Sequence, residues 1–166
     1  KSTLLWAISG LLLPASGTIA FSKSNGLNGP RIGFLAHQSF LYEELTVSEN
    51  LIFAARLNGI DDMFDGVQKI LRQVGLQEQA DTKVSSLSRG QNQLAAFARA
   101  VISGPQVLLL DEPFSHLDES AIEKVCALIE SLKSPDSLIL LATHDKPLGR
   151  RLCPISVRLH AGKVVR

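Results

Sequence analysis

The sequence has few of the residues that mark disulfide scaffolds, membrane spans or nucleic-acid binders. Its two cysteines, Cys126 and Cys153, lack metal-ligand spacing, so we expect unpaired thiols in a reducing compartment. The longest apolar stretch, residues 4–13, contains Ser9 and stops at Pro14, whereas a membrane-spanning helix needs ~20 apolar residues. A formal net charge of +1 is too balanced for a protein that binds nucleic acid mainly by neutralising phosphates. With 45% hydrophobic residues, the expected class is a globular domain with a packed core.

The apolar pattern predicts an α/β fold with a parallel sheet. Residues 107–110, "VLLL", and 138–142, "LILLA", are continuous apolar runs, which are typical of strands buried on both faces. A helical pattern lies between them, so the unit reads as a parallel strand–helix–strand crossover. Residues 31–36 and 18–21 predict two further strands, separated by the loop "NGLNGP".

Helical patterns fill most of the segment between residues 46 and 102. "TVSE", residues 46–49, has capping-box spacing and opens an apolar helix that we expect to end at Gly59. Apolar residues repeat at helical period from Met63 to Val74 and again over residues 94–102. The remaining expected elements are a helix over residues 3–13 that ends at Gly10 or at Pro14, and a hairpin with its turn at Ala161-Gly162.

Ionisable side chains follow the two buried runs. Asp111 and Glu112 come directly after "VLLL", at the edge of the sheet where open α/β proteins bind ligands. A carboxylate there can hold Mg²⁺, and a second one can orient or deprotonate an attacking water. The alternative is two acids that cap a strand end before a turn at Pro113. His144 follows the next run, on the same edge, where it either donates a hydrogen bond to a γ-phosphate or is an ordinary loop histidine.

Two further places have polar residues of the kind found at phosphate sites. Lys1-Ser2-Thr3 opens the first helix, and Lys-Ser at a helix N-terminus is what the phosphate loop G-x-x-x-x-G-K-[ST] leaves when its glycines are cut away. On this interpretation the chain is a fragment that lacks the glycine segment and the strand before it. Gln38 follows a strand, where its amide would meet the metal or the attacking water, or would simply be a polar loop residue.

"LSRGQ", residues 87–91, resembles the LSGGQ signature motif of the ATP-binding cassette (ABC) family. The pentapeptide alone is weak, since a serine-capped helix start explains it equally well. The order of motifs is specific: Lys-Ser on a helix, a glutamine after a strand, "LSRGQ", "VLLLDEP", "SHLD" and "THD". The resemblance covers the whole chain and implies a P-loop NTPase fold of the ABC type, with a helical subdomain over about residues 38–101.

The resemblance implies which residues bind ATP and Mg²⁺. Lys1 would bind the β- and γ-phosphates, Ser2 would ligate Mg²⁺, and Thr3 would lie near the α-phosphate. Asp111 would hold Mg²⁺ through water. Gln38 would contact the metal and couple the nucleotide to a membrane partner.

It also implies which residues act on the γ-phosphate. Glu112 would be the general base and His144 the switch histidine. Residues 115–118, which end at Asp118, would form the loop that crosses a dimer.

In the ABC family the signature motif serves the partner's nucleotide. Ser88, Gly90 and Gln91 would therefore touch an ATP bound mainly by a second subunit in a head-to-tail homodimer. Two residues depart from the family pattern. Arg89 stands where a glycine is usual and puts a side chain beside the anion site. Leu94 stands where an arginine is frequent and removes polar anchoring.

The implied function is ATP hydrolysis that powers export through a separate integral-membrane permease, at the cytoplasmic side of the plasma membrane. "IGFLAHQSFLYEELTVSENLIFAARLNG" most resembles the haem-exporter ATPases of cytochrome c maturation. Two alternatives remain: a soluble ABC-type ATPase that acts on ribosomes or DNA, and a binding-only cassette without hydrolysis. The spacing between Gln38 and "LSRGQ" leaves no room for the coiled coil of the DNA-repair type, and the retention of Glu112 and His144 argues against a binding-only cassette.

Overall fold

The computed structural model describes residues 1–21, 29–60 and 64–165. In chain order its elements are α1 (Ser2–Ile8), β1 (Ile32–Leu35), α2 (Val47–Leu57), α3 (Phe64–Val74), the 3-10 helices η1 (Gln77–Gln79) and η2 (Val84–Ser86), α4 (Arg89–Val101), β2 (Val107–Asp111), α5 (Glu119–Ser131), β3 (Leu138–Ala142), α6 (Lys146–Leu152), β4 (Arg158–His160) and β5 (Lys163–Val165).

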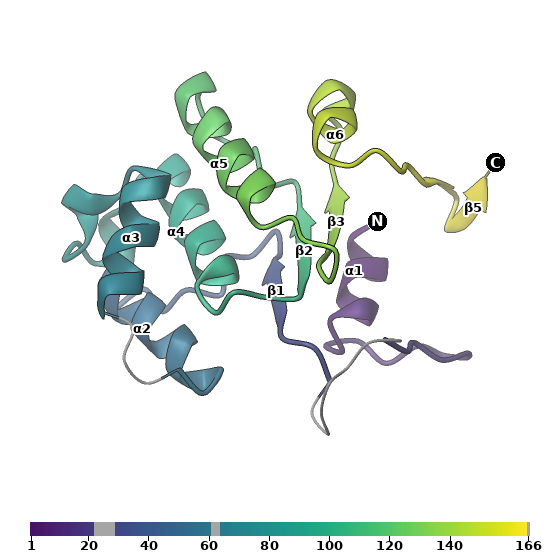
Figure 1. Ribbon diagram of the computed structural model, residues 1–166, viewed down its shortest axis with the longest axis horizontal. Helices are drawn as coiled ribbons and strands as arrows, with labels where there is room; N and C mark the ends of the chain where they lie inside the picture. Colours follow the sequence, from purple (N-terminus) through teal and green to yellow (C-terminus); the bar gives the residue numbers. More distant parts are fainter. Residues whose placement is uncertain (22–28, 61–63, 166) are drawn as a thin grey trace.

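Three parallel strands form the sheet on which the site is built. Their order is β1-β2-β3, with Leu35 opposite Leu110 and Asp111 opposite Ala142. The connection from β1 to β2 runs through α2, α3 and α4, and α5 connects β2 to β3 (Figure 1). The predicted parallel crossover is confirmed. Because all three strands run the same way, the residues that follow them meet at one edge.

Helices cover both faces of the sheet, as the alternation of side chains along β2 requires. Leu108 and Leu110 point into the larger core cluster, which contains the buried residues of α4 and α5. Leu109 joins Leu5 of α1 in a smaller cluster on the opposite face. Burial of each such leucine contributes ~1.5–3 kcal/mol, so the central strand is fixed between two apolar layers.

Helix α4 lies unusually close to the backbone of β1. A Cβ built on Gly33 would overlap the carbonyl oxygen of Ala100 and lie 2.9 Å from Cγ of Pro105. Only glycine allows this approach, which brings α4, the helix that Ser88 caps, against the sheet.

Most of the expected helices are confirmed with their boundary signals. Thr46 and Glu49 form the predicted capping box at the start of α2, and Ser88 and Gln91 form a second one at the start of α4. Ala161 and Gly162 both have positive φ in the turn between β4 and β5, as the predicted hairpin requires. Met63 and most of the "NGLNGP" loop lie outside the described residues.

Four expectations need correction. Residues 18–21 form no strand, because a strand needs a neighbour to complete its hydrogen bonds and none pairs with this stretch in the part that the structure describes. Of the two expected ends of the first helix, the stop at Gly10 is confirmed and the one at Pro14 is wrong, because α1 ends at Ile8 and Gly10 adopts a φ of 80°. β3, at one edge of the described sheet, is only partly buried, with Leu138 44% exposed. Helix α6, capped by Asp145, was not anticipated.

Within residues 1–21, 29–60 and 64–165, every helix is too short or too polar to cross a bilayer.

Candidate active site

The backbone of Glu112 is held in an uncommon conformation at the end of β2. Its φ is 49°, in the left-handed region that non-glycine residues seldom adopt. Its N–H donates to the carbonyl oxygen of Ala142 over 2.8 Å. This turn of the chain directs the Glu112 side chain toward the residues that follow β3.

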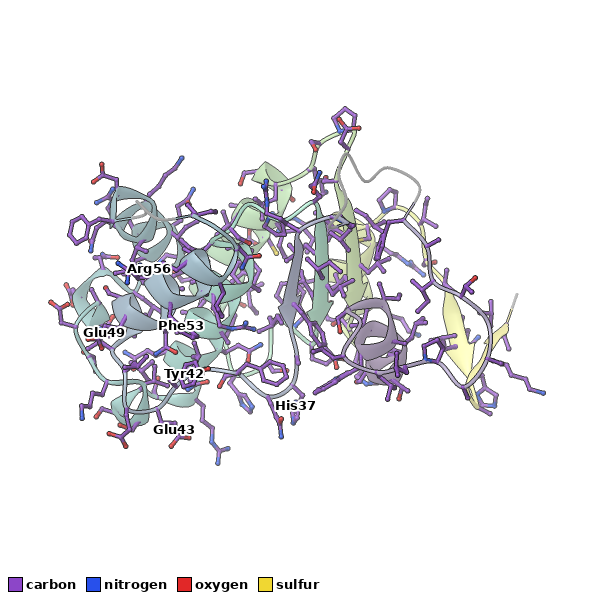
Figure 2. The ribbon with its side chains drawn as sticks, turned by 90° about the horizontal axis from the view of Figure 1, so that it is seen from below. His37, Tyr42, Glu43, Glu49, Phe53 and Arg56 are labelled. Atoms are coloured by element: carbon purple, nitrogen blue, oxygen red, sulfur yellow. The ribbon has the colours of Figure 1, made fainter. Side chains whose placement is uncertain are left out.

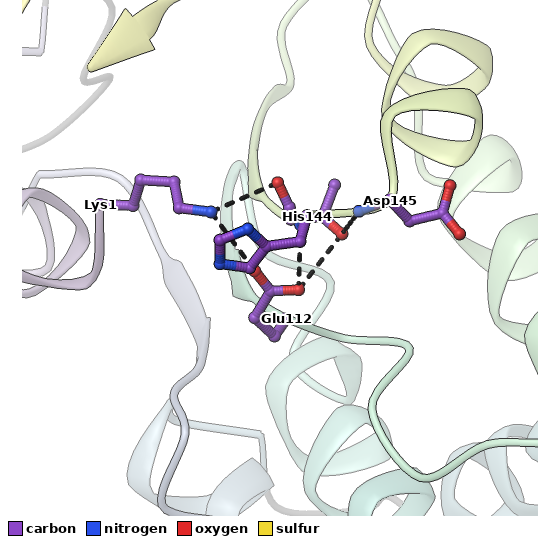
Figure 3. Close-up of polar contacts among 5 residues, drawn as sticks. Lys1, Glu112, His144 and Asp145 are labelled. Atoms are coloured by element: carbon purple, nitrogen blue, oxygen red, sulfur yellow. Dashed lines mark hydrogen bonds and ion pairs between the residues drawn. The ribbon is translucent and has the colours of Figure 1, made fainter. Parts of the chain in front are cut away.

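The carboxylate of Glu112 joins side chains and backbone from three segments (Figure 3). Its Oε1 lies 3.4 Å from Nζ of Lys1 and 3.5 Å from Nε2 of His144. Its Oε2 accepts hydrogen bonds from the Thr143 hydroxyl over 3.3 Å and from the His144 N–H over 3.2 Å. Lys1 also donates to the Thr143 carbonyl over 3.3 Å. The structure thus brings together four residues from three segments that lie far apart in the sequence.

Asp111 is suited to hold a metal ion through water. The residue is 4% exposed, and its Oδ2 is a buried atom that has no hydrogen-bond partner among the described residues. A buried oxygen of this kind is costly unless a further ligand satisfies it. No group of three or more His, Cys, Asp or Glu side chains able to hold a metal occurs in the described ranges, so the remaining ligands would have to be hydroxyl, water or phosphate oxygens, as Mg²⁺ favours.

The other candidate ligands of the metal and phosphates are exposed. Ser2 and Thr3 are the first two residues of α1, with Lys1 at its N-cap. Gln38 lies three residues beyond the end of β1, in an exposed bend. Since Leu35 pairs with Leu110, this bend is at the same edge of the sheet as Asp111.

Ser88 caps α4, as the plain interpretation of "LSRGQ" predicts. Its Oγ accepts from the N–H of Gln91 over 3.2 Å, and Oε1 of Gln91 accepts from the Ser88 N–H over 2.9 Å. In both bonds the side chain is the acceptor. The hydroxyl proton of Ser88 and the amide protons of Gln91 are not used by the capping box, so the cap does not conflict with anion binding.

The loop of residues 115–118 lies against the start of α4. His116 has a φ of 64°, and a Cβ on Gly90 would lie 2.8 Å from its carbonyl oxygen. Asp118 caps α5 by accepting from the N–H of Ala121 over 2.8 Å. The predicted dimer-crossing loop and the signature motif are therefore neighbours.

The two departures from the family pattern differ in their surroundings. Arg89 is exposed and lines a shallow pocket with His37, Glu43 and His116. Leu94 is 8% exposed within the larger core cluster, so packing takes the place of polar anchoring.

An aromatic cluster connects α1 with the Gln38 bend. The Trp6 ring packs edge-on against Phe34 and Phe40, with centroids 5.8 Å and 5.7 Å apart. Arg99 of α4 lies over the Phe40 ring at 5.7 Å and donates to the Phe34 carbonyl over 2.7 Å. Burial lowers the pKa of the Arg99 guanidinium.

The sequence reasoning missed two residues of this site. Thr143 stands inside "THD" but has no role in the motif reading, and it contacts both Glu112 and the N–H of Asp145. Gln93 donates to the carbonyl oxygens of Glu112 and Pro113. Its place five residues after Ser88 in the signature helix was the only available signal.

Comparison with known proteins identifies the family. A family profile described as ABC transporter matches residues 1–115. The chain belongs to the ABC transporter family. The spermidine/putrescine import ATP-binding protein PotA of Fusobacterium nucleatum is 34% identical over all of the chain. The lipoprotein-releasing system ATP-binding protein LolD of Legionella pneumophila is 33% identical over 99% of it, and the ABC transporter ATP-binding protein NatA of Bacillus subtilis is 30% identical over 99%.

A solved structure confirms the fold of this ABC domain. The chain aligns with a protein titled "Structure of ATP binding subunit of ABC transporter" with a TM-score of 0.88 and 30% identity, over 99% of the chain and 71% of that protein. The chain spans 46% of PotA, 70% of NatA and 78% of LolD. The predicted α/β fold of the ABC type is thus confirmed.

Proposed function

We propose that this ABC domain hydrolyses ATP and thereby drives transport through a separate membrane permease. The observation that carries the proposal is the placement of Glu112, whose carboxylate is held at the sheet edge between Lys1, Thr143 and His144. These are the positions that a phosphate-binding lysine, a general base and a γ-phosphate sensor would need.

Lys1 and Glu112 would change partners when ATP binds. In the structure, Nζ of Lys1 lies 3.4 Å from Glu112. The β- and γ-phosphates would offer Lys1 a stronger anionic partner, as in other P-loop sites. Glu112 would then be free to accept a proton from the attacking water, while His144 donates to the γ-phosphate.

Mg²⁺ would be held by Ser2 directly and by Asp111 through water, with Gln38 as a further contact. When bound, the ion neutralises charge that develops on the phosphate oxygens. Thr3 would bind near the α-phosphate. The unpartnered Oδ2 of Asp111 supports this assignment.

The active form would be a head-to-tail homodimer. Ser88, Gly90 and Gln91 would bind the γ-phosphate of an ATP that the partner subunit holds at its own equivalent of the Lys1-Ser2-Thr3 segment. Residues 115–118, including Asp118, would cross the dimer. The contact between Gly90 and the His116 carbonyl supports a single surface that contains both segments.

The helical subdomain, about residues 38–101, would dock on the permease at the cytoplasmic side of the membrane. Its surface carries an exposed aromatic pair, Tyr42 and Phe53, which are 55% and 39% exposed with ring centroids 5.2 Å apart. Figure 2 shows the pair on the helical part of the molecule, with His37 on the loop that leads back to the sheet. Glu43, Glu49 and Arg56 add charge around it. Exposed aromatic side chains with polar neighbours are typical of interface anchors.

The transported substrate would be set by the permease. The resemblance to haem exporters stays a prediction that the relatives named above do not favour, because two of them are named for polyamine import and lipoprotein release. Export likewise stays a prediction, since PotA is named for import. A soluble ATPase that acts on ribosomes or DNA is the second candidate. The net charge of +1 and the transporter names of the relatives favour the first candidate.

ATP turnover with and without the permease tests the proposal. We expect turnover that rises when the permease is present, and loss of that stimulation in Phe53→Asp with basal turnover intact. Turnover that responds to ribosomes or DNA instead would favour the second candidate. ATP binding without any turnover would indicate a binding-only cassette.

A further inference from the structure

Gln93 connects the signature helix to the backbone of the proposed general base. Its Nε2 lies 3.2 Å from the carbonyl oxygen of Glu112 and 3.3 Å from that of Pro113. A glutamine amide has two N–H donors, so this one side chain can serve both carbonyls. Gln93 is only partly buried.

These two carbonyls belong to a segment that needs support. Glu112 has a φ of 49°, a conformation that non-glycine residues keep only where the surroundings hold it. The next residue is proline, which has no N–H to donate. Restraint on the peptide after Glu112 must therefore act through carbonyl oxygens, and these are the atoms that Gln93 contacts.

The Glu112 backbone is consequently held from two sides. Its N–H donates to the carbonyl oxygen of Ala142 in β3 over 2.8 Å. Its carbonyl oxygen accepts from the Ser115 N–H in the turn that follows and from Gln93 of α4, each over 3.2 Å. Removal of the Gln93 amide leaves the local bonds from Ala142 and Ser115 but loses the bond that ties the Glu112 carbonyl to α4.

Gln93 belongs to the same end of α4 as the signature motif. The helix begins after Ser88, and Gln93 lines one pocket with Arg89 and His116. A displacement of this helix end would move the Gln93 amide, and with it the Glu112 carbonyl.

We propose that Gln93 is a positioning residue that keeps Glu112 aimed for hydrolysis and makes this aim depend on the position of the signature helix. Gln93 itself touches no reacting atom. The inference rests on the proposed function of Glu112 as general base. It predicts an effect on kcat rather than on the binding of ATP.

Three variants test the inference in the protein with its permease. Gln93→Met keeps the length of the side chain without a donor, and Gln93→Glu replaces the donor with an acceptor. Asn92→Ala is the matched control, because Asn92 is the neighbouring residue and lines the same pocket. We expect both Gln93 variants to lose roughly ten- to hundredfold in kcat with an unchanged KM, since small misplacements of catalytic groups cost this much. Asn92→Ala should retain kcat and KM.

A double-mutant cycle separates positioning from general damage. If Gln93 acts through Glu112, Gln93→Met should cause no further loss of single-turnover rate in a Glu112→Gln background. An equal proportional loss in both backgrounds, or wild-type kcat in both Gln93 variants, would overturn the inference. If Glu112→Gln itself keeps normal turnover, the proposed function fails instead. We expect the two Gln93 variants and Asn92→Ala to have equal melting temperatures. A large drop in melting temperature confined to the Gln93 variants would assign Gln93 a purely structural role and overturn the inference.

Discussion

Gly90→Ala tests whether the signature helix and the loop of residues 115–118 act as one surface. The added Cβ would lie 2.8 Å from the carbonyl oxygen of His116, which is backbone and cannot rotate away. Relief of this contact requires a shift of about half an ångström, and overpacking of this kind costs ~1–3 kcal/mol. Alanine regains up to ~1 kcal/mol of helix propensity in α4. The net loss of unfolding free energy should therefore lie between about 0 and 3 kcal/mol.

The effect of Gly90→Ala on activity should be larger than its effect on stability. The shift occurs where Ser88 would meet the partner's nucleotide, so we expect turnover to fall at least roughly tenfold. Urea denaturation gives the free energy of unfolding, and steady-state ATPase assays give the turnover. Gly66→Ala in α3 makes the same chemical change in a helix that carries no proposed site residue. Wild-type turnover in Gly90→Ala would refute the reasoning.

Three other predictions concern packing, pH and the dimer. Gly33→Ala should lower the free energy of unfolding, measured by urea denaturation, by at least ~1–3 kcal/mol, because the new methyl group would overlap the Ala100 carbonyl oxygen. Equal stability of variant and wild type would show that the packing of α4 does not depend on this close approach. Arg151 donates to Glu123 over 2.7 Å and lowers the pKa of that carboxyl. Arg151→Met should therefore be less stable than wild type at neutral pH, and the difference in unfolding free energy should shrink as the pH falls below 4.5, the ordinary pKa of Glu123. A difference that does not change with pH would contradict this. In a Glu112→Gln background, Ser88→Arg and Lys1→Ala should each fail to form ATP-dependent homodimers. Their mixture should form heterodimers, detected by size-exclusion chromatography, because one composite site is intact. Ser88→Arg homodimers at wild-type levels would exclude a role of Ser88 in trans.

Much of the fold could be predicted because local signals agree with the packing. The run "VLLL" is apolar at every position because β2 is buried on both faces. Glycines at the helix ends, such as Gly75 with a φ of 78°, mark stops that any extended pattern must respect. The stretch 18–21 has strand-like composition, but strand formation depends on a partner, which local composition does not encode.

The site was predictable in its residue types but not in its contacts. The order of motifs indicated Lys1, Asp111, Glu112 and His144. It could not indicate the left-handed turn at Glu112, because that conformation depends on bonds from β3 and α4. The contact of Gln93 could not be predicted for the same reason: it arises where α4 approaches the end of β2, and no local sequence pattern encodes that approach.

The most direct measurement of the central claim is ATP turnover and Mg-ATP binding by Glu112→Gln. A general base contributes roughly 10²–10⁴-fold, and the variant keeps the size of the side chain while removing its basicity. The account predicts a loss of turnover of that size with Mg-ATP affinity retained. Near-normal turnover in Glu112→Gln would contradict it, because the carboxylate held between Lys1, Thr143 and His144 would then not be the group that activates water.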